Sequence, residues 1–193
     1  LDDNITIRLA GGLCGIQKDD VDTVTICGMG GKLMKDIIEA GKDRLSNGMQ
    51  LILSPQSEVR EFRAYLLENG IDILSEMMIK DEGKYYFIMD CVYHDMAEGA
   101  VYNNNTHLQG KNAAEYTEEE LRYGRYLIDN HSEVLKEYLD KEYGSFISIQ
   151  KSLKEQNVKK PSAAIEKRLQ ELEADIEYNR KAELSCCAQD AQK

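Results

Sequence analysis

The chain has 193 residues, which is enough for one domain with an appendage and a substantial core. Its formal net charge of −11 argues against a protein that coats nucleic acid indiscriminately, although a local basic patch remains compatible with RNA recognition. No stretch is apolar enough for a membrane span, no signal peptide is recognisable, and the five cysteines form no CxxC pair. We therefore expect a cytoplasmic protein without a structural metal.

Residues 1–93 alternate between strand-like and helix-like segments. Alternating or β-branched apolar residues indicate strands, and apolar residues at helical spacing indicate helices. The expected strands are 5–9, 21–27 and 49–53, and the expected helices are 32–40 and 57–67, the second capped by Ser57. This alternation predicts an α/β fold, with a mostly parallel sheet and helices on both faces.

Two further strand-like runs, 71–80 and 84–93, close this region, and only Asp81-Glu82-Gly83 separates them. A three-residue loop that ends in glycine is typical of a hairpin. Parallel neighbours need a much longer crossover, so these two strands must be antiparallel. The sequence therefore predicts a parallel sheet that ends in one reversed strand.

The second half of the chain has a helical character. Residues 94–115 form a linker rich in glycine and asparagine, and Thr117 with Glu120 then forms a capping box. An apolar stripe follows, with breaks expected near Asn130 and Gly144. After Pro161, the residues Ile165, Leu169, Leu172 and Ile176 recur at heptad spacing. We predict an antiparallel, coiled-coil-like helical hairpin over 116–185, followed by a polar tail at 186–193.

Two glycine-rich turns follow predicted strands: Gly11-Gly12 and Gly28-Met29-Gly30-Gly31. In open α/β sheets, ligands bind at the carboxyl ends of the strands, and glycine allows the backbone to approach a ligand closely. An alternative interpretation of either turn is that its glycines only let the chain bend. The second has three glycines in four positions between a strand and a helix, which favours a binding role. It matches neither a P-loop nor G-x-G-x-x-G.

The segments 21–41, 49–70 and 73–88 resemble the bacterial tRNA (adenine(22)-N(1))-methyltransferase family, TrmK, whose hallmark is a Gly-Met-Gly-Gly turn after a strand. The similarity runs along nearly all of residues 5–140. It implies a class I (Rossmann-like) methyltransferase sheet followed by a coiled-coil-like helical domain. It also implies methyl transfer from S-adenosyl-L-methionine to N1 of adenine 22 in tRNA.

The resemblance also implies that part of the cofactor site is missing. The first glycine turn of the family and its ribose-binding acidic residue are not in this sequence. We therefore expect 1–93 to be a partial domain that lacks its first strands, and we expect the chain to bind the cofactor weakly or not at all. The turn at Ala10-Gly11-Gly12-Leu13 also departs from the Gly-Asp/Asn-Gly-Leu pattern of the family.

The expected activity gives candidate roles to single residues. Adenine N1 has an in-plane lone pair, so rate would come from positioning at Gly28, Met29 and Gly30 rather than from a general base. The expected cofactor contacts are Gly11, Gly12, Leu13, Cys27 and Gly28. The expected tRNA contacts are Lys32, Lys35, Arg60, Arg63, Lys159 and Lys160. No metal ligand and no membrane contact are expected, and a monomer is compatible with the sequence.

Two alternatives stay open. The chain could belong to a methyltransferase that acts on another RNA or on a small molecule, because the terminal hairpin fits that function equally well. It could instead be a non-catalytic interaction module, which the acidic charge and the missing cofactor half would favour.

Overall fold

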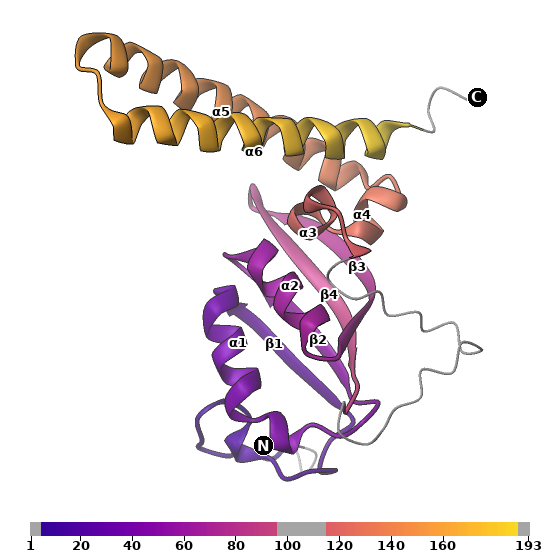
Figure 1. Cartoon of the computed structure of the whole chain (residues 1–193). Helices are drawn as coiled ribbons and strands as arrows, with labels where there is room; N and C mark the ends of the chain where they lie inside the picture. The colour runs from indigo at the N-terminus through magenta and orange to yellow at the C-terminus, as the bar shows by residue number, and fades with distance from the viewer. Residues whose placement is uncertain (1–4, 96–114, 189–193) are drawn as a thin grey trace. The chain divides into compact units, whose positions relative to one another are not determined.

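The computed structural model describes residues 5–95 and 115–188 (Figure 1). These residues divide into two units. One contains residues 5–77 and 86–95 together with Glu115, and the other contains residues 78–85 and 116–188. The sequence-based division placed the whole terminal hairpin with the sheet, whereas the structure groups the tip of that hairpin with the helices.

A four-stranded mixed sheet forms the frame of the first unit. Its strands are β1 (Thr23–Met29), β2 (Gln50–Pro55), β3 (Ile71–Asp81) and β4 (Lys84–Tyr93), in the spatial order β1-β2-β4-β3. β1 and β2 are parallel, and β4 runs antiparallel to β2. Glu82 and Gly83 connect β3 to β4 with φ values of 46° and 77°, as a tight hairpin turn requires. The predicted reversed strand is confirmed, and it lies inside the sheet rather than at its edge.

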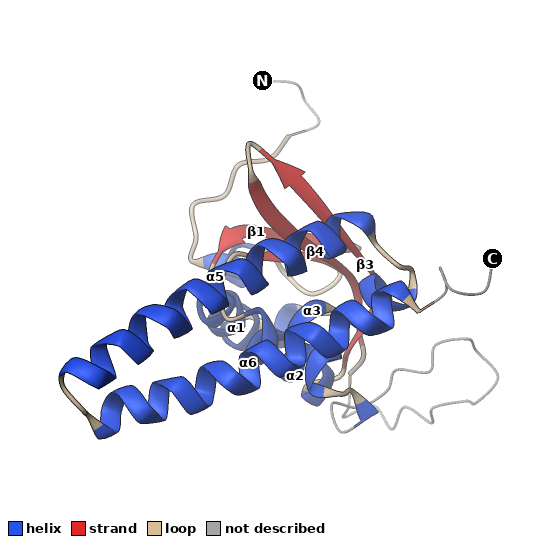
Figure 2. Cartoon of the chain, turned by 90° about the horizontal axis from the view of Figure 1, so that it is seen from above, coloured by secondary structure: helices blue, strands red, loops and turns tan. Residues whose placement is uncertain are grey.

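Helices α1 (Gly31–Ala40) and α2 (Val59–Glu68) pack side by side on one face of the sheet (Figures 1 and 2). Their apolar stripes supply the fully buried Met34, Ile38 and Leu66, and β2 supplies the fully buried Leu51 and Leu53. The prediction of helices on both faces is wrong for the described residues. The chain moves in one direction from β1 through β2 to β3, so right-handed crossovers place both helices on the same side.

The first predicted strand, residues 5–9, is not a strand in the structure. All five residues are exposed, and Ile7 retains 76% of its accessible surface. A strand exists only when its backbone pairs with a neighbour, and no described strand pairs with this segment. The alternating apolar and polar residues indicate a propensity for strand structure, but that propensity is not sufficient without a neighbouring strand.

The second unit is helical apart from the hairpin tip. Its elements are α3 (Glu118–Tyr123), α4 (Arg125–Asp129), α5 (Glu133–Lys159) and α6 (Ala163–Cys187). The Thr117–Glu120 capping box is present at the start of α3. α5 and α6 run antiparallel as a helical hairpin (Figure 2). The break expected at Gly144 is absent, because α5 continues through it, and Cys186 of the predicted tail is a buried residue of α6.

A polar cluster lies at the seam between α5 and α6. Glu142 of α5 accepts hydrogen bonds from the Tyr123 hydroxyl at 2.7 Å and the Tyr138 hydroxyl at 2.9 Å. Asn179 of α6 is 1% exposed and donates to the same carboxylate at 3.0 Å. A buried polar group that is hydrogen-bonded across such a seam favours one register of the two helices.

The hairpin tip joins the second unit through contacts with α5. Lys80 forms an ion pair with Glu137, and the ring of Tyr85 lies edge-on to that of Tyr138 at a centroid distance of 5.3 Å. Lys141 donates to the carbonyl of Gly83 at 3.2 Å. None of the helices in the described residues is long and apolar enough to cross a membrane.

Candidate functional site

The turn at residues 28–31 lies where two parallel strands end. Met29 of β1 pairs with Pro55 of β2, so the carboxyl ends of both strands meet at one edge of the sheet. The register shifts between Cys27 and Met29, so Gly28 is an extra residue that forms a bulge with φ +79°. Cys27 and Gly28 are exposed there. This is the edge at which open α/β sheets bind their ligands.

The three glycines of the turn are required for different reasons. Gly28 needs positive φ, but nothing lies within 4 Å of the position that a Cβ would take. Gly30 is extended, and a Cβ there would come within 2.6 Å of the Ser57 hydroxyl. A Cβ on Gly31 would meet the Phe62 Cβ and two backbone oxygens at 2.9 Å. Gly30 and Gly31 therefore allow α1 and α2 to approach closely, and Gly28 leaves open space beside the strand end.

Glu58 fastens this turn to the start of α2. Its carboxylate accepts from the backbone N–H of Lys32 at 3.2 Å and from the Ser57 hydroxyl at 3.1 Å. The carbonyl of Ser57 accepts from the N–H of Gly31 at 2.9 Å. The amino end of α1 thus has protein acceptors already, and a fixed negative charge lies beside the turn. This arrangement disfavours an anionic ligand at the turn and favours a neutral or cationic one.

The predicted capping role of Ser57 is wrong. Glu58 is the N-cap residue of α2, with φ +51° and no side-chain cap to that helix. Its side chain instead caps the neighbouring helix α1. The sequence signals this arrangement only through the polar residues Ser57 and Glu58 after a strand. That pattern does not indicate which helix either side chain caps.

A pocket of about 260 Å³ lies between the first turns of α1 and α2. Its lining is Gly31, Lys32, Lys35, Glu58, Glu61 and Phe62. Lys32 and Lys35 were predicted from the sequence, whereas the two glutamates and Phe62 were missed. Phe62 reads from the sequence only as a core residue of its helix.

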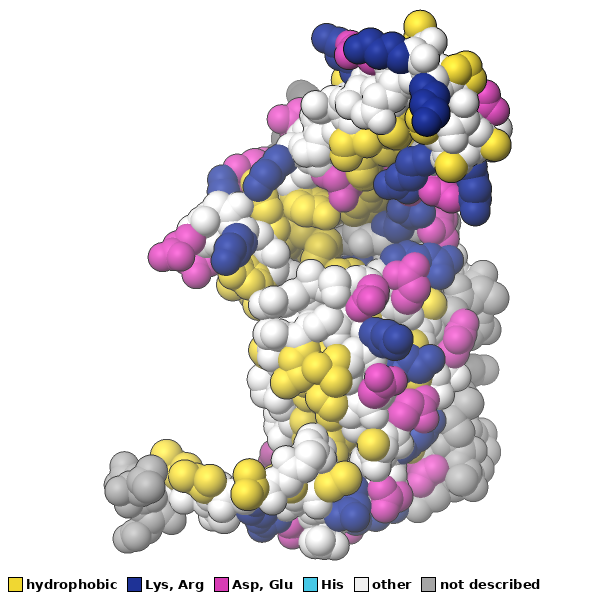
Figure 3. Space-filling model, turned by 90° about the vertical axis from the view of Figure 1, so that its left-hand side faces the viewer, with side chains coloured by type: hydrophobic (Ala, Val, Ile, Leu, Met, Phe, Trp, Pro, Cys, Tyr) yellow, Lys and Arg dark blue, Asp and Glu magenta, His cyan; other side chains and the backbone are white. Residues whose placement is uncertain are grey.

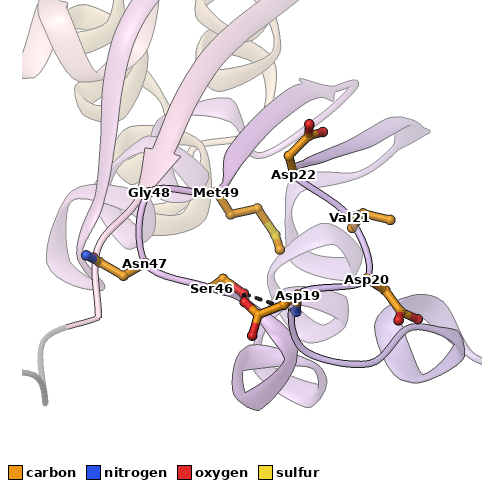
Figure 4. A pocket seen from close by; sticks show the side chains of 8 residues that line it. All are labelled: Asp19, Asp20, Val21, Asp22, Ser46, Asn47, Gly48 and Met49. Atoms are coloured by element: carbon orange, nitrogen blue, oxygen red, sulfur yellow. Dashed lines mark hydrogen bonds between the residues drawn. The ribbon is translucent and has the colours of Figure 1, made fainter.

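A larger pocket, of about 430 Å³, lies at the amino ends of β1 and β2 (Figure 4). Two of its acidic residues are engaged with their neighbours, because the Ser46 hydroxyl donates to Asp19 at 2.5 Å and Asp20 pairs with Arg8 at 2.7 Å. It lies at the end of the strands opposite to the glycine turn. Within the described ranges, no cluster of three or more histidine, cysteine or acidic residues is arranged to hold a metal ion.

Comparison with known proteins identifies the family. The sequence model of the tRNA (adenine(22)-N(1))-methyltransferase family, TrmK, matches residues 1–174. The chain belongs to this family.

Three relatives illustrate the likeness to TrmK proteins. The tRNA (adenine(22)-N(1))-methyltransferase of Bacillus subtilis is 36% identical over 89 residues, which are 46% of this chain and 37% of that protein. The crystal structure of B. subtilis TrmK has a TM-score of 0.73 at 24% identity, covering 92% of this chain and 70% of that one. A Streptococcus pneumoniae putative tRNA (m1A22) methyltransferase in complex with S-adenosyl-L-methionine has a TM-score of 0.69 at 24% identity, covering 91% and 67%. The two structures show the shared fold. The matched stretch thus spans just over a third of the curated relative.

The two glycine turns predicted to share a TrmK cofactor site lie apart in this structure. Gly12 and Leu13 belong to a short 3-10 helix, Gly12–Gly15, which packs on α1. A Cβ on Gly12 would touch Ile37, and Leu13 lies against Gly41. Those contacts lie about 9 and 15 Å along α1 from Gly31. The structure therefore brings Cys27, Gly28, Met29 and Gly30 together, but not Gly11, Gly12 and Leu13 with them.

The predicted tRNA-contacting residues of this TrmK chain fall into three groups. Lys32 and Lys35 are exposed at the pocket, and Lys159 and Lys160 are exposed at the end of α5. Arg60 is half-buried in the first turn of α2. The Arg63 side chain is fully buried in an ion pair, so it is not available to RNA and the prediction for it is wrong.

Proposed function

We propose that this chain serves S-adenosyl-L-methionine-dependent methylation of tRNA at N1 of adenine 22. The observation that carries the proposal is the Gly28–Gly31 turn at the carboxyl ends of β1 and β2, in a chain whose family is a tRNA (adenine(22)-N(1))-methyltransferase family. The S. pneumoniae relative was crystallised with S-adenosyl-L-methionine, which supports the same cofactor here.

The residues at the turn fit a sulfonium donor. Gly28 leaves open space at the end of β1. Among the described residues, Glu58 is the one charged side chain that is hydrogen-bonded to the backbone where the turn enters α1, and its charge is negative. We assign the cofactor contact to Cys27 and Gly28, and the positioning of the reacting atoms to Gly28, Met29 and Gly30. Gly11, Gly12 and Leu13 stay a sequence-based prediction.

When bound, the donor supplies an electrophilic methyl group. The lone pair of adenine N1 forms the new N–C bond as the S–C bond breaks, and the sulfur departs as a neutral thioether. The methylated adenine then loses a proton from N6 to solvent. Because no strong base is needed, the turn contributes by holding the two reactants in line and excluding water. The adenine must first leave its stack to reach the turn.

The helical hairpin offers a surface for the tRNA backbone. Residues 151–171 contain six basic and three acidic side chains in a chain whose net charge is −11. Basic side chains gather at the top of Figure 3, where the α5–α6 hairpin faces the viewer. Lys159 and Lys160 lie in this segment and are exposed. Excess positive charge on an acidic protein supports local contact with phosphates. We further propose that the enzyme is cytoplasmic.

The test is methyl transfer to a tRNA transcript. The protein, expressed from its complete reading frame, is incubated with methyl-labelled S-adenosyl-L-methionine, and the product is mapped by the arrest of reverse transcription. We expect label at adenine 22 and none when that adenine is replaced by guanine. Label at another nucleotide would support the alternative of a different RNA substrate. Failure to label any tRNA would refute the proposal, and failure to bind the donor as well would favour the interaction module.

A further inference from the structure

The pocket between α1 and α2 adjoins the proposed methyl-transfer turn and shares Gly31 with it. Gly31, Lys32 and Lys35 contribute from α1, and Glu58, Glu61 and Phe62 contribute from α2. Gly31 is the residue at which the turn passes into α1. A ligand held in the pocket would therefore lie beside the reacting adenine.

Two of the charged groups in the pocket are uncommitted. The Glu58 carboxylate is held by the Lys32 N–H and the Ser57 hydroxyl, and the Lys35 ammonium lies 5.1 Å from the centre of the Tyr65 ring. Across residues 5–95 and 115–188, the Glu61 carboxylate and the Lys32 ammonium have no hydrogen-bond or ion-pair partner. One strong acceptor and one strong donor thus face the same small pocket.

This combination selects the ligand by its chemistry. A bare phosphate is disfavoured by two carboxylates, and a purely apolar ligand is disfavoured by four charged residues. The volume of about 260 Å³ lies below the range of about 300–1,000 Å³ typical of pockets for drug-sized ligands. The base of a nucleotide satisfies all three conditions, because it is neutral, polar and small, and its phosphate stays outside the pocket. An amino group of the base can donate to Glu61, and the adjoining phosphate can pair with Lys32.

The geometry points to this pocket as a binding site for a nucleotide that flanks the methylated adenine. The inference rests on the proposed function, because it takes the substrate to be RNA. It assigns Glu61 the recognition of an amino-bearing base and Lys32 the contact with the adjacent phosphate. Holding the neighbouring nucleotide would keep the target adenine unstacked beside Gly28.

The experiment compares Glu61→Gln with Glu68→Gln, an exposed position at the far end of the same helix. Steady-state methylation of tRNA is measured with each. Loss of one charge-assisted hydrogen bond is expected to raise the KM for tRNA about tenfold in Glu61→Gln while kcat changes little. Glu68→Gln should match the unmodified protein. Lys32→Ala should weaken tRNA binding, with Lys18→Ala as its control.

A substrate series identifies the nucleotide that is read. Each nucleotide flanking the target is replaced by uridine, which lacks an exocyclic amino group. One replacement should raise KM about tenfold for the unmodified protein and should have no further effect on Glu61→Gln. If Glu61→Gln behaves like Glu68→Gln while the unmodified protein methylates tRNA, the pocket assignment is wrong and the proposed function stands. If the unmodified protein methylates no tRNA, the proposed function fails. The pocket assignment is then tested by tRNA binding alone, and it is wrong if neither Glu61→Gln nor Lys32→Ala weakens that binding.

Discussion

Arg63 donates from its Nε to the Oε1 atom of Glu76 at 2.7 Å, and the two side chains are 0% and 1% exposed. The guanidinium also lies 5.1 Å from the centre of the Phe87 ring. α2 and β3 are thus joined by a buried ion pair inside the sheet unit. Arg63 has a structural role where the sequence predicted a contact with RNA.

Removing one partner of this pair should be strongly destabilising. Arg63→Met leaves the Glu76 carboxylate buried without its counter-charge, which typically costs about 3–5 kcal/mol. The free energy of unfolding is measured by urea titration. The double variant Arg63→Met/Glu76→Leu should recover most of the loss, because no unpaired charge remains. A single variant as stable as the exposed-site control Glu68→Gln would contradict this account.

Gly28→Ala separates a role in the site from backbone strain. Gly28 and Gly48 both have positive φ, at 79° and 84°, and neither has an atom within 4 Å of a would-be Cβ. Alanine at either position should cost about 1–2 kcal/mol of stability. Gly48 precedes β2, at the opposite end of the strands. Only Gly28→Ala should therefore also lower methyl transfer, by up to about a hundredfold. Equal activity of the two variants would remove Gly28 from the site.

Cys186 should make stability fall at alkaline pH. Burial raises the pKa of its thiol to about 11, above the ordinary value of 9.0. The thiol of the unfolded chain ionises first, so this contribution to stability is complete below about pH 8.5 and is lost as pH rises towards 11. Unfolding is measured by urea at several pH values across this window. In Cys186→Ala, the number of protons released on unfolding in this window should fall by up to ~1, so the free energy of unfolding should depend less on pH. Cys187→Ala, at an exposed position, should leave this pH dependence unchanged. If the free energy of unfolding of the two variants changes with pH in the same way, the buried Cys186 thiol is not the cause of the loss of stability.

The end of the helical hairpin should contribute electrostatic affinity for tRNA. The double variant Lys159→Ala/Lys160→Ala is expected to weaken binding at low salt and to reduce the slope of log affinity against log salt by about 1–2. Fluorescence anisotropy of labelled tRNA, measured over a range of salt concentrations, reports both quantities. Lys159→Arg/Lys160→Arg keeps the charge and should keep the slope. An unchanged slope in the alanine variant would show that these lysines are only solvated.

Features that depend on neighbours in the sequence were predicted well. The β3–β4 hairpin follows from the short loop before Lys84, in which glycine adopts a positive φ. The Thr117–Glu120 capping box follows from a spacing of three residues. The Gly28–Gly31 turn was visible as a break between a β-branched strand and an amphipathic helix. In each case the signal and its structural consequence lie within one or two turns of backbone.

Features that depend on partners across space were not predictable. Ile7 and Leu9 have the pattern of a strand, but no described strand pairs with them. Leu13 reads as part of a ligand-binding turn, yet it packs against Gly41. Glu58 reads as a surface charge, yet it caps a helix other than its own.

The amino-acid sequence alone therefore determined the order of the strands and helices in residues 21–93, the family and the glycine turn, because propensity, turn chemistry and periodicity act locally along the chain. Tertiary structure decided which face of the sheet the helices cover, that Arg63 is buried and that Glu61 and Lys32 share a pocket. Those outcomes depend on which distant side chains exclude water from one another, and no local pattern encodes the identity of a partner.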